Sequence, residues 1–353
     1  LRFSATLAKI GTGQDSVSGW GDSSNVPLYN LSYGFGANDW RVGFGKRTRH
    51  WSPSATTSLF LSRNAPAFHA AYMEKTGDTA IDLPVLRALG PWKAEFFVGT
   101  TSDSGQPDNA RIMGMRLQIR PARGLELDFI RTAQWGGAGY ASGGGAFWDV
   151  LTGSTNEGPA ANANQMAGFG VSYRPPVGQE NWRVYGQLAG EDEAGGLPSC
   201  LFYLAGVSLD TQTFGVPTTV ALETVDTRTE QSANGFCGAN SAYNNAVYSY
   251  AHKGQVLGAA LDSQGRSIGL NVSHEFNQLS VDWSLRHILV NEASAASHRL
   301  SSRRVEGTVA MLRAVRPFGS GQIEGILAYQ GVDLNKVGSP KSLRAGVGMS
   351  LDF

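Results

Sequence analysis

The sequence has few charged residues, few cysteines and no long apolar run. Only 16% of its 353 residues are charged, and 29 Lys and Arg residues balance 29 Asp and Glu residues. A chain with zero net charge and no basic block excludes a general nucleic-acid-binding surface. Its apolar runs fall far short of the roughly 20 residues that a membrane-spanning helix needs, which excludes a helical membrane protein. Two cysteines exclude a disulfide-rich scaffold and a Cys-rich zinc module.

Glycine, in contrast, is abundant at 45 residues, and apolar residues alternate with polar or small ones. Successive residues of a β-strand point to opposite faces, so alternation predicts a strand with one apolar face. The pattern is clearest at the C-terminus, with Leu343, Ala345, Val347, Met349, Leu351 and Phe353 on one face. It recurs at 110–120, 125–135, 165–175 and 321–331. Helical periodicity is nearly absent, and the sequence predicts an all-β protein.

Two architectures fit this alternation, a soluble β-sandwich and a transmembrane antiparallel β-barrel. The segments are about 10 to 12 residues long, which exceeds the roughly 5 to 6 of soluble strands and fits a tilted membrane strand. Short connections such as 121–124 alternate with long ones such as 136–164, 191–199 and 228–265. We therefore predict a single outer-membrane β-barrel domain over residues 1–353, with long extracellular loops and short periplasmic turns.

The predicted strands number 17, and the weaker ones lie near 1–10, 26–36, 38–48, 57–63 and 66–74. Single-chain bacterial barrels close with an even number of strands. We therefore expect 18 strands, with one hidden within residues 229–264 or before Leu1. We favour a missing N-terminal strand, which makes the N-terminal part of the full protein absent from this chain.

Five stretches of the chain resemble the Wzi capsule-assembly outer-membrane proteins. They are Trp51-Ser52-Pro53 with residues 58–65, residues 89–97, residues 126–132 leading into Trp135-Gly136-Gly137, and above all residues 185–198, YGQLAGEDEAGGLP. The resemblance implies an 18-stranded barrel that acts as a lectin, tethers capsular polysaccharide to the cell surface and performs no catalysis. Two departures stand out: this chain has Trp51-Ser52-Pro53-Ser54 where the family reads Trp-Gly-Pro-Gly, and it has no counterpart of the family's N-terminal periplasmic helices.

Three consecutive acidic residues, Glu191, Asp192 and Glu193, lie at the outer end of a predicted strand. They repel one another unless cations or hydrogen-bond donors neutralise them. One interpretation is a site for sugar hydroxyls or a cation at the barrel mouth. The other, which we favour, is a set of lumen carboxylates paired with barrel arginines such as Arg131 and Arg183.

Aromatic residues in the predicted outer loops are candidates for stacking on sugar rings. Tyr140 and Trp148 flank a Gly-rich loop, and Tyr243 and Tyr248 lie in the longest loop among Asn residues. Aromatic residues near strand ends also form the girdles at the membrane interfaces. Trp135 fits the girdle or the core better, and the loop tyrosines equally fit a plug in which they pack on one another.

Cys200 and Cys237 fall in or beside two outer loops on the same side of the predicted barrel. The compartment is oxidising, and closing this loop contributes roughly 3 to 4 kcal/mol in the chain-entropy picture. We predict a disulfide; two buried thiols are the alternative.

Signals for catalysis are weak. Two of the six histidines, His252 and His298, lie in outer loops near Asp262 and Glu292, but no motif connects them. No metal-ligand spacing appears, and we expect neither metal nor cofactor.

The predicted function is binding of a capsular polysaccharide or exopolysaccharide by the extracellular loops of an outer-membrane barrel. Its expected surroundings are membrane lipid, lipopolysaccharide and other polysaccharide-export proteins of the envelope. Lumen residues Arg116, Arg120, Glu126, Asp128 and Arg183 are expected to be structural. The main alternative is an open channel or export pore, because a barrel of this size is wide enough for water. Mixed charge signs in the lumen favour a plugged barrel.

Overall fold

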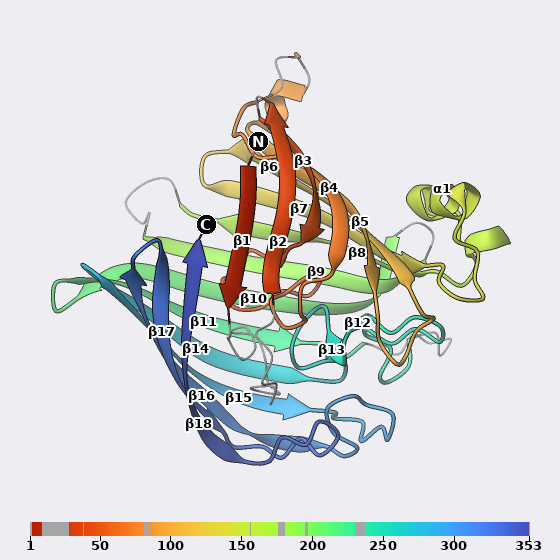
Figure 1. The fold of residues 1–353 in the computed structure, drawn as a ribbon. Coiled ribbons are helices and arrows are strands. Elements are labelled where there is room, and N and C mark those ends of the chain that lie inside the picture. The colour runs from red at the N-terminus through yellow and green to blue at the C-terminus, as the bar shows by residue number, and fades with distance from the viewer. Residues whose placement is uncertain are drawn as a thin grey trace.

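The chain folds into a closed antiparallel β-barrel whose first strand pairs with its last (Figure 1). The computed structural model describes residues 2–8, 28–37, 39–80, 83–84, 86–155, 157–175, 181–194, 197–229 and 237–352. Closure is made by Thr6, Leu7 and Ala8 of the first strand, which pair with Asp352, Leu351 and Ser350 of the last. A closed sheet leaves no edge strand with unpaired backbone groups.

The barrel strands are β1 (Arg2–Ala8), β2 (Leu28–Ala37), β3 (Trp40–Lys46), β4 (His69–Lys75), β5 (Trp92–Thr101), β6 (Ala110–Ala122), β7 (Leu125–Trp135), β8 (Asn164–Tyr173), β9 (Trp182–Ala194), β10 (Leu197–Thr213), β11 (Val216–Asp226), β14 (Arg266–Phe276), β15 (Leu279–Val290), β16 (Val305–Phe318), β17 (Gly321–Gln330) and β18 (Ser342–Asp352). A two-stranded sheet of β12 (Ala251–His252) and β13 (Gln255–Val256) lies within one connection. The helices are α1 (Gly144–Thr152) and the 3-10 turns η1 (Leu86–Leu89) and η2 (Gly158–Ala160).

The antiparallel barrel is as predicted, but the expected count of 18 strands is wrong for the described residues, which supply 16. The predicted strand at 57–63 does not form. Leu59, Phe60 and Leu61 are all buried side by side in the sequence, whereas a strand of the barrel wall buries alternate residues on one face. Without this segment the number of strands is even, and no hidden strand is needed for closure.

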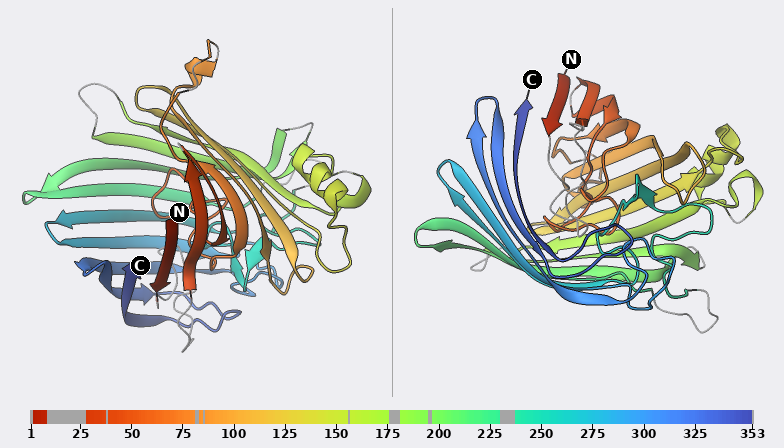
Figure 2. Two further views of the ribbon diagram at one scale, coloured as in Figure 1. Left: turned by 45° about the horizontal axis from the view of Figure 1, so that its top comes forward. Right: turned by 60° about the horizontal axis from the view of Figure 1, so that its bottom comes forward.

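The connections separate into two ends, as Figure 2 shows. At one, here called the short-turn end, residues 123–124, 214–215, 277–278 and 319–320 join neighbouring strands. Gly124 and Gly215 have positive φ of 77° and 76° there, a conformation that glycine adopts without a Cβ clash. At the opposite, long-loop end lie residues 47–68, 136–163, 227–265, 291–304 and 331–341.

The long loop predicted at 191–199 does not form. β9 and β10 remain paired as far as Ala194 and Leu197. The two strands therefore continue as a ladder where the sequence suggested a loop.

The register alternates apolar and small or polar residues across the wall. On one face, Leu222 pairs with Leu270, which pairs with Leu285. One residue away, Ala221 pairs with Asn271, which pairs with Ser284 on the opposite face. Leu222 and Leu285 are about half exposed, whereas Asn271 and Ser284 line the interior. The outside of the barrel is therefore an apolar belt, as expected for a wall that faces lipid.

Helix α1 lies against the outside of the barrel near the long-loop end (Figure 1). Its Ala146 and Val150 bury Met113 of β6 and Ala133 and Trp135 of β7. Both buried helix residues lie on one face of α1, four positions apart, so the opposite face is exposed. Within the described ranges, no helix is long and apolar enough to cross a membrane.

The alternating wall leads to a first prediction. Replacing the outward-facing Leu222 with Lys should destabilise the barrel by about 2 to 4 kcal/mol, because the ammonium group must enter the hydrocarbon near the middle of β11. The matched control is Ala221→Lys, one residue away, whose side chain enters the polar lumen. Denaturant unfolding in lipid vesicles measures both, and equal effects would contradict the assigned faces.

Candidate functional site

The loop that follows β3, residues 47–68, folds into the barrel and is held there by Gln187 of β9. The Gln187 amide donates to the Trp51 carbonyl over 2.6 Å, and its oxygen accepts from the Leu59 amide over 2.8 Å. Trp51 is buried with its ring 5.4 Å from that of Phe97. This loop, here called the inward loop, fills the barrel with apolar side chains. Sequence reasoning missed this role of Gln187, although Gln187 lies within the family-like stretch 185–198.

Tyr243 joins the inward loop to the second plugging segment, residues 237–264. Its hydroxyl donates to the Leu59 carbonyl over 2.8 Å and accepts from the Ala259 amide over 3.1 Å. Its ring stacks on Tyr250 at 5.8 Å and meets the edge of Phe202 of β10 at 5.2 Å. Tyr243 is completely buried. One side chain thus connects two loops and the barrel wall, and the long-loop end is plugged by them.

Two further links hold residues 237–264 in place. Cys200 of β10 forms a disulfide with Cys237. Arg299, from the 291–304 loop, donates to both carboxylate oxygens of Asp262 and to the Tyr243 carbonyl. The plug is therefore tied covalently to the wall and by a buried ion pair to a neighbouring loop.

The predicted sugar-binding tyrosines of the longest loop lie inside this plug. Tyr248 is 1% exposed, and its hydroxyl donates to the Gly136 carbonyl over 2.9 Å. Burial is the main cause that raises the pKa of Tyr248 to about 12, and the nearby Tyr140 adds to this rise. Tyr243 and Tyr248 therefore have the packing role that the sequence left open as an alternative.

Tyr140 and Trp148 are the predicted residues whose rings reach the surface. Tyr140 is 39% exposed, and its ring centroid lies 5.9 Å from that of the buried Tyr248. Trp148 is 63% exposed on α1, outside the barrel wall. Asn245 accepts from the amides of Val247 and of Tyr248, the residue whose ring packs on Tyr140, and the neighbouring Asn244 is exposed. We call Tyr140, Asn244 and Asn245 the cap surface.

Glu191 has a different partner from the one predicted. Its carboxylate accepts from the backbone amide of Tyr243 over 3.0 Å. Arg131 faces outward and donates to the carbonyls of Val150 and Leu151 at the end of α1. Arg183 is inside the barrel and donates to Ser172 and to the Pro53 carbonyl. The expected pairing of the acidic run with these arginines is therefore wrong for Glu191, and the side chains of Asp192 and Glu193 lie outside the described residues.

Arg131 was predicted to face the lumen, but its position in β7 directs it outward. Phe129 is 48% exposed on the outside, and Arg131 follows two residues later on the same face. Asp128 and Glu126 face inward, as predicted, and they accept hydrogen bonds from Arg116 and Arg120, respectively.

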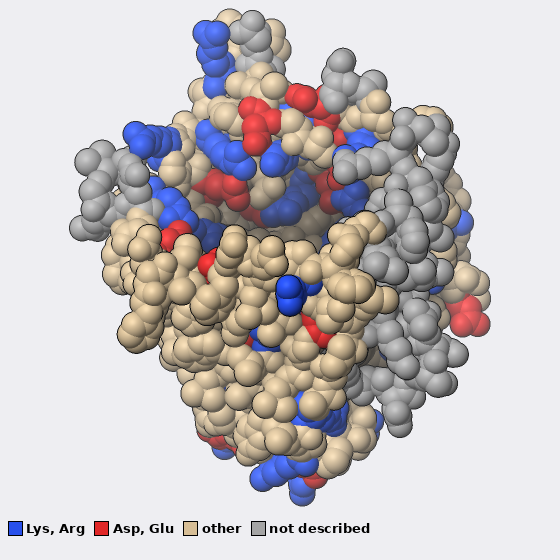
Figure 3. Space-filling model, turned by 60° about the vertical axis from the view of Figure 1, so that its left-hand side comes forward, with Lys and Arg blue, Asp and Glu red and all other residues tan. Residues whose placement is uncertain are grey.

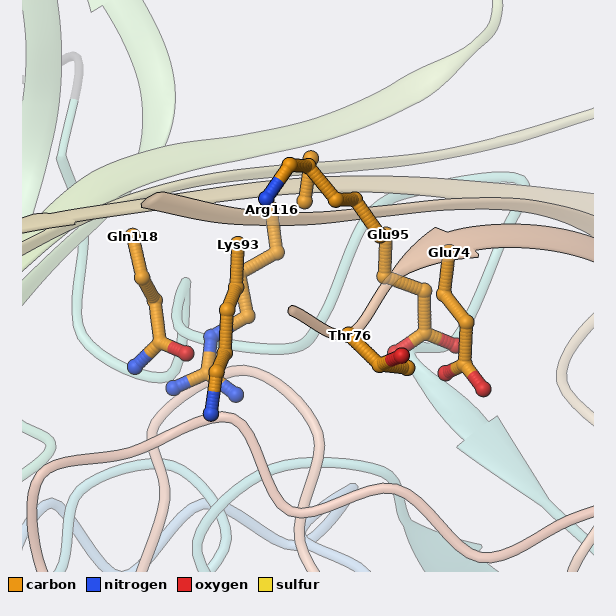
Figure 4. Close-up of a pocket in the computed structure, with 8 residues that line it drawn as sticks. Glu74, Thr76, Lys93, Glu95, Arg116 and Gln118 are labelled. Carbon is orange, nitrogen blue, oxygen red and sulfur yellow. The ribbon is translucent and has the colours of Figure 1, made fainter. Parts of the chain in front are cut away.

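At the short-turn end the barrel is hollow, and Figure 3 shows charged side chains of both signs around the opening. A cavity of about 190 Å³ lies there between β4, β5 and β6. Figure 4 shows the side chains that project into it, namely Glu74, Thr76, Lys93, Glu95, Arg116 and Gln118. We call this space the vestibule.

Alternating charges connect the vestibule to the inward loop. Glu74 binds Arg41 at 3.0 Å and Arg47 at 2.6 Å, and Glu95 binds Arg47 at 3.2 Å and Arg49 at 2.8 Å. Glu95 also accepts from the Trp51 indole over 3.1 Å. Opposite charges in contact stabilise each other's ionised form inside a protein. Neither arginine was among the predicted site residues, although Arg47 lies within the predicted strand 38–48 and Arg49 directly follows it.

A second polar cavity, of about 180 Å³, lies on the other side of the inward loop. Ser54 and Thr56 of that loop donate to Glu223, and Arg286 donates to Thr56 and lies 3.5 Å from Glu223. The inward loop therefore divides the lumen and is bonded to both walls. In the described part of the chain, no three His, Cys, Asp or Glu side chains are arranged to hold a metal ion.

The Tyr243 hydroxyl provides a second prediction. Tyr243→Phe leaves the Leu59 carbonyl and the Ala259 amide without this partner, which costs about 1 to 3 kcal/mol. In planar bilayers the wild-type protein should be nearly silent, and the variant should spend at least about fivefold more time in conducting states. Tyr140→Phe, at the cap surface, is the control. A wild-type protein with steady large conductance would overturn the plugged barrel.

His252 provides a third prediction, on pH. Burial is the main cause that lowers the pKa of His252 to about 4, and the positive charges of Lys253 and Lys46 lower it further. The neutral ring accepts from the Ser102 amide over 3.1 Å. Because the unfolded pKa is about 6.5, this stabilisation is complete above pH 6.5 and is lost as the pH falls from there to about 4.

The expected loss is ~2–3 kcal/mol, seen as faster hydrogen exchange at residues 249–257 after correction for intrinsic rates. His252→Gln keeps an acceptor for Ser102 and does not titrate, so it should reduce this pH dependence. An unchanged pH profile in the variant would show that His252 is not responsible. Burial also lowers the pKa of His50 of the inward loop to about 4, so His50 titrates over the same pH range.

Residues 9–330 match the family described as capsule assembly protein Wzi. A protein from the cps region of Klebsiella pneumoniae, of 55.8 kDa and uncharacterised, is 32% identical over 203 residues; the match covers 55% of this chain and 40% of that protein. The fold is similar to that of Wzi, an outer membrane protein involved in group 1 capsule assembly in Escherichia coli and a carbohydrate-binding β-barrel. That structure has a TM-score of 0.77 and 20% identity, and the match covers 99% of this chain and 83% of that one.

Proposed function

Because the chain belongs to the capsule assembly protein Wzi family, we propose that it binds a bacterial surface polysaccharide at the outer membrane. The polysaccharide is capsular or an exopolysaccharide, and the protein helps to attach or assemble it at the cell surface. The long-loop end faces outward, and the short turns face the periplasm. The barrel acts as a single domain whose apolar belt contacts outer-membrane lipid and lipopolysaccharide.

The observation that carries this proposal is the plug. Tyr243, Tyr250 and the inward loop close the long-loop end with an apolar core, so a long polymer meets a surface there and not a pore. On that surface Tyr140 presents an exposed ring supported by buried Tyr248. An exposed ring face suits a sugar, whose CH groups stack on it, and the exposed Asn244 side chain offers an amide for hydrogen bonds to the sugar hydroxyls.

The proposed mechanism is adhesion without catalysis. Each contact at the cap surface is weak, but a repeating polymer presents the same unit many times, and linked contacts sum through effective concentration. Trp148 and the acidic residues Asp192 and Glu193 are proposed as further contacts around the rim, whereas Glu191 binds the Tyr243 amide inside the plug. Other polysaccharide-export proteins of the envelope are the proposed partners.

An open channel or export pore is the alternative function. The vestibule favours it, because the lumen has a cavity lined by charged side chains at the short-turn end. The plug opposes it, and the mixed signs of Glu74, Lys93 and Arg116 give no selectivity for one charge. Conductance of the wild-type protein therefore separates the two functions.

The cap surface provides the fourth prediction. Tyr140→Ala should weaken binding of purified surface polysaccharide roughly tenfold, or about 1.4 kcal/mol, because the stacking face is removed. In cells, the same variant should release more polysaccharide into the medium. The matched control is Phe214→Ala, a fully exposed ring in the β10–β11 turn at the opposite end. Equal binding by both variants would exclude Tyr140 as a sugar contact.

A further inference from the structure

A recess interrupts the outer wall of the barrel below α1. Its volume is about 430 Å³, within the roughly 300 to 1,000 Å³ of typical small-molecule sites. Its outward-facing side chains are Met115, Leu117, Phe129, Arg131, Ala167 and Phe169. We call it the α1 recess.

The recess exists because small residues lie level with Arg131 on the next two strands of the sheet. Arg131 of β7 pairs with Ala167 of β8, which pairs with Gly190 of β9. In the next outward row, Phe129 pairs with Phe169, and both rings are about half exposed. Two large apolar rings therefore stand beside a small-residue row, which leaves a hollow on an otherwise lipid-facing surface.

Arg131 fixes a positive charge at one margin of this hollow. Its guanidinium donates to the Val150 carbonyl over 2.5 Å, to the Leu151 carbonyl over 2.9 Å and to the Gln165 side chain. The carbonyls at a helix C-terminus attract a cation, so α1 holds the guanidinium on the outside of the wall. An apolar hollow with a cation at its margin is complementary to an amphiphile that has an acyl chain and an anionic head group.

We propose that the α1 recess binds lipopolysaccharide, with one acyl chain against Ala167, Phe129 and Phe169 and a phosphate near Arg131. This inference rests on the outer-membrane location in the proposed function. It gives the 136–163 loop a second role: the loop carries Tyr140 of the cap surface, and its Val150 and Leu151 carbonyls hold the Arg131 guanidinium at the lipid site. The apolar belt elsewhere contacts lipid without selecting it.

The test uses the full chain, purified in mild detergent, and the lipid that remains bound in native mass spectrometry. Purified lipid A is the anionic probe, and phosphatidylcholine, which is zwitterionic and has no net charge, is the comparison. Ala167→Trp fills the recess and should lower the bound lipid A at least fivefold. Ala345→Trp makes the same change at an exposed position of β18, on the outward-facing row of Leu343 and Val347, and should leave binding unchanged.

Arg131→Gln should lower lipid A binding and leave phosphatidylcholine binding unchanged. Equal lipid A retention by Ala167→Trp and Ala345→Trp would overturn the proposal, and so would equal binding of the two lipids by the wild-type protein. Heat-modifiable electrophoretic mobility shows whether each variant is folded. Polysaccharide binding is measured separately, so a loss of the lipid site leaves the proposed function standing, and failure to bind polysaccharide leaves the lipid result interpretable.

Discussion

The hydrogen bonds of the Tyr243 hydroxyl are the interaction on which the interior of this barrel depends. A wide barrel has too much internal space for wall side chains alone to fill. Here the space at the long-loop end is filled by two loops, and the Tyr243 hydroxyl satisfies a backbone group on each side, the Leu59 carbonyl and the Ala259 amide. Tyr243 itself has φ of 62°, an uncommon conformation for a residue with a side chain, and it persists because packing surrounds the ring completely.

The two halves of the lumen have opposite physical characters. Toward the long-loop end, Trp51, Leu59 and Tyr250 form an apolar core like that of a soluble protein. Toward the short-turn end, carboxylates and guanidinium groups pair around a polar cavity. The inward loop is the boundary, since Trp51 packs on Phe97 while its indole donates to Glu95. The inward loop thus separates the charged cavity of the vestibule from the apolar core at the long-loop end.

The sequence predicted the wall well and the interior poorly, for a physical reason. Alternation is local, so segments such as 110–120 and 125–135 could be assigned to strands without any knowledge of their partners. The strand predicted at 57–63 is wrong because this segment is apolar but lacks the two-residue period of a strand: Leu59, Phe60 and Leu61 do not alternate with polar residues. Arg131 was placed in the lumen although Phe129, two residues earlier, already marked the outward face. The burial of Tyr243 depends on residues far away in the chain, and no local pattern reports it.

The plug has a consequence for the order of assembly. Tyr243 and Leu59 meet across 184 positions of the chain, and Gln187 and Trp51 across 136. Contacts between such distant residues bring no stability until the intervening chain has closed around them. An N-terminal portion that stops before Cys237 contains the inward loop but lacks the second plugging segment, so the plug forms only after the chain beyond Cys237 has been made. Sealing is therefore a built-in indicator of completeness: a barrel that holds back ions is one whose later strands have already joined its first.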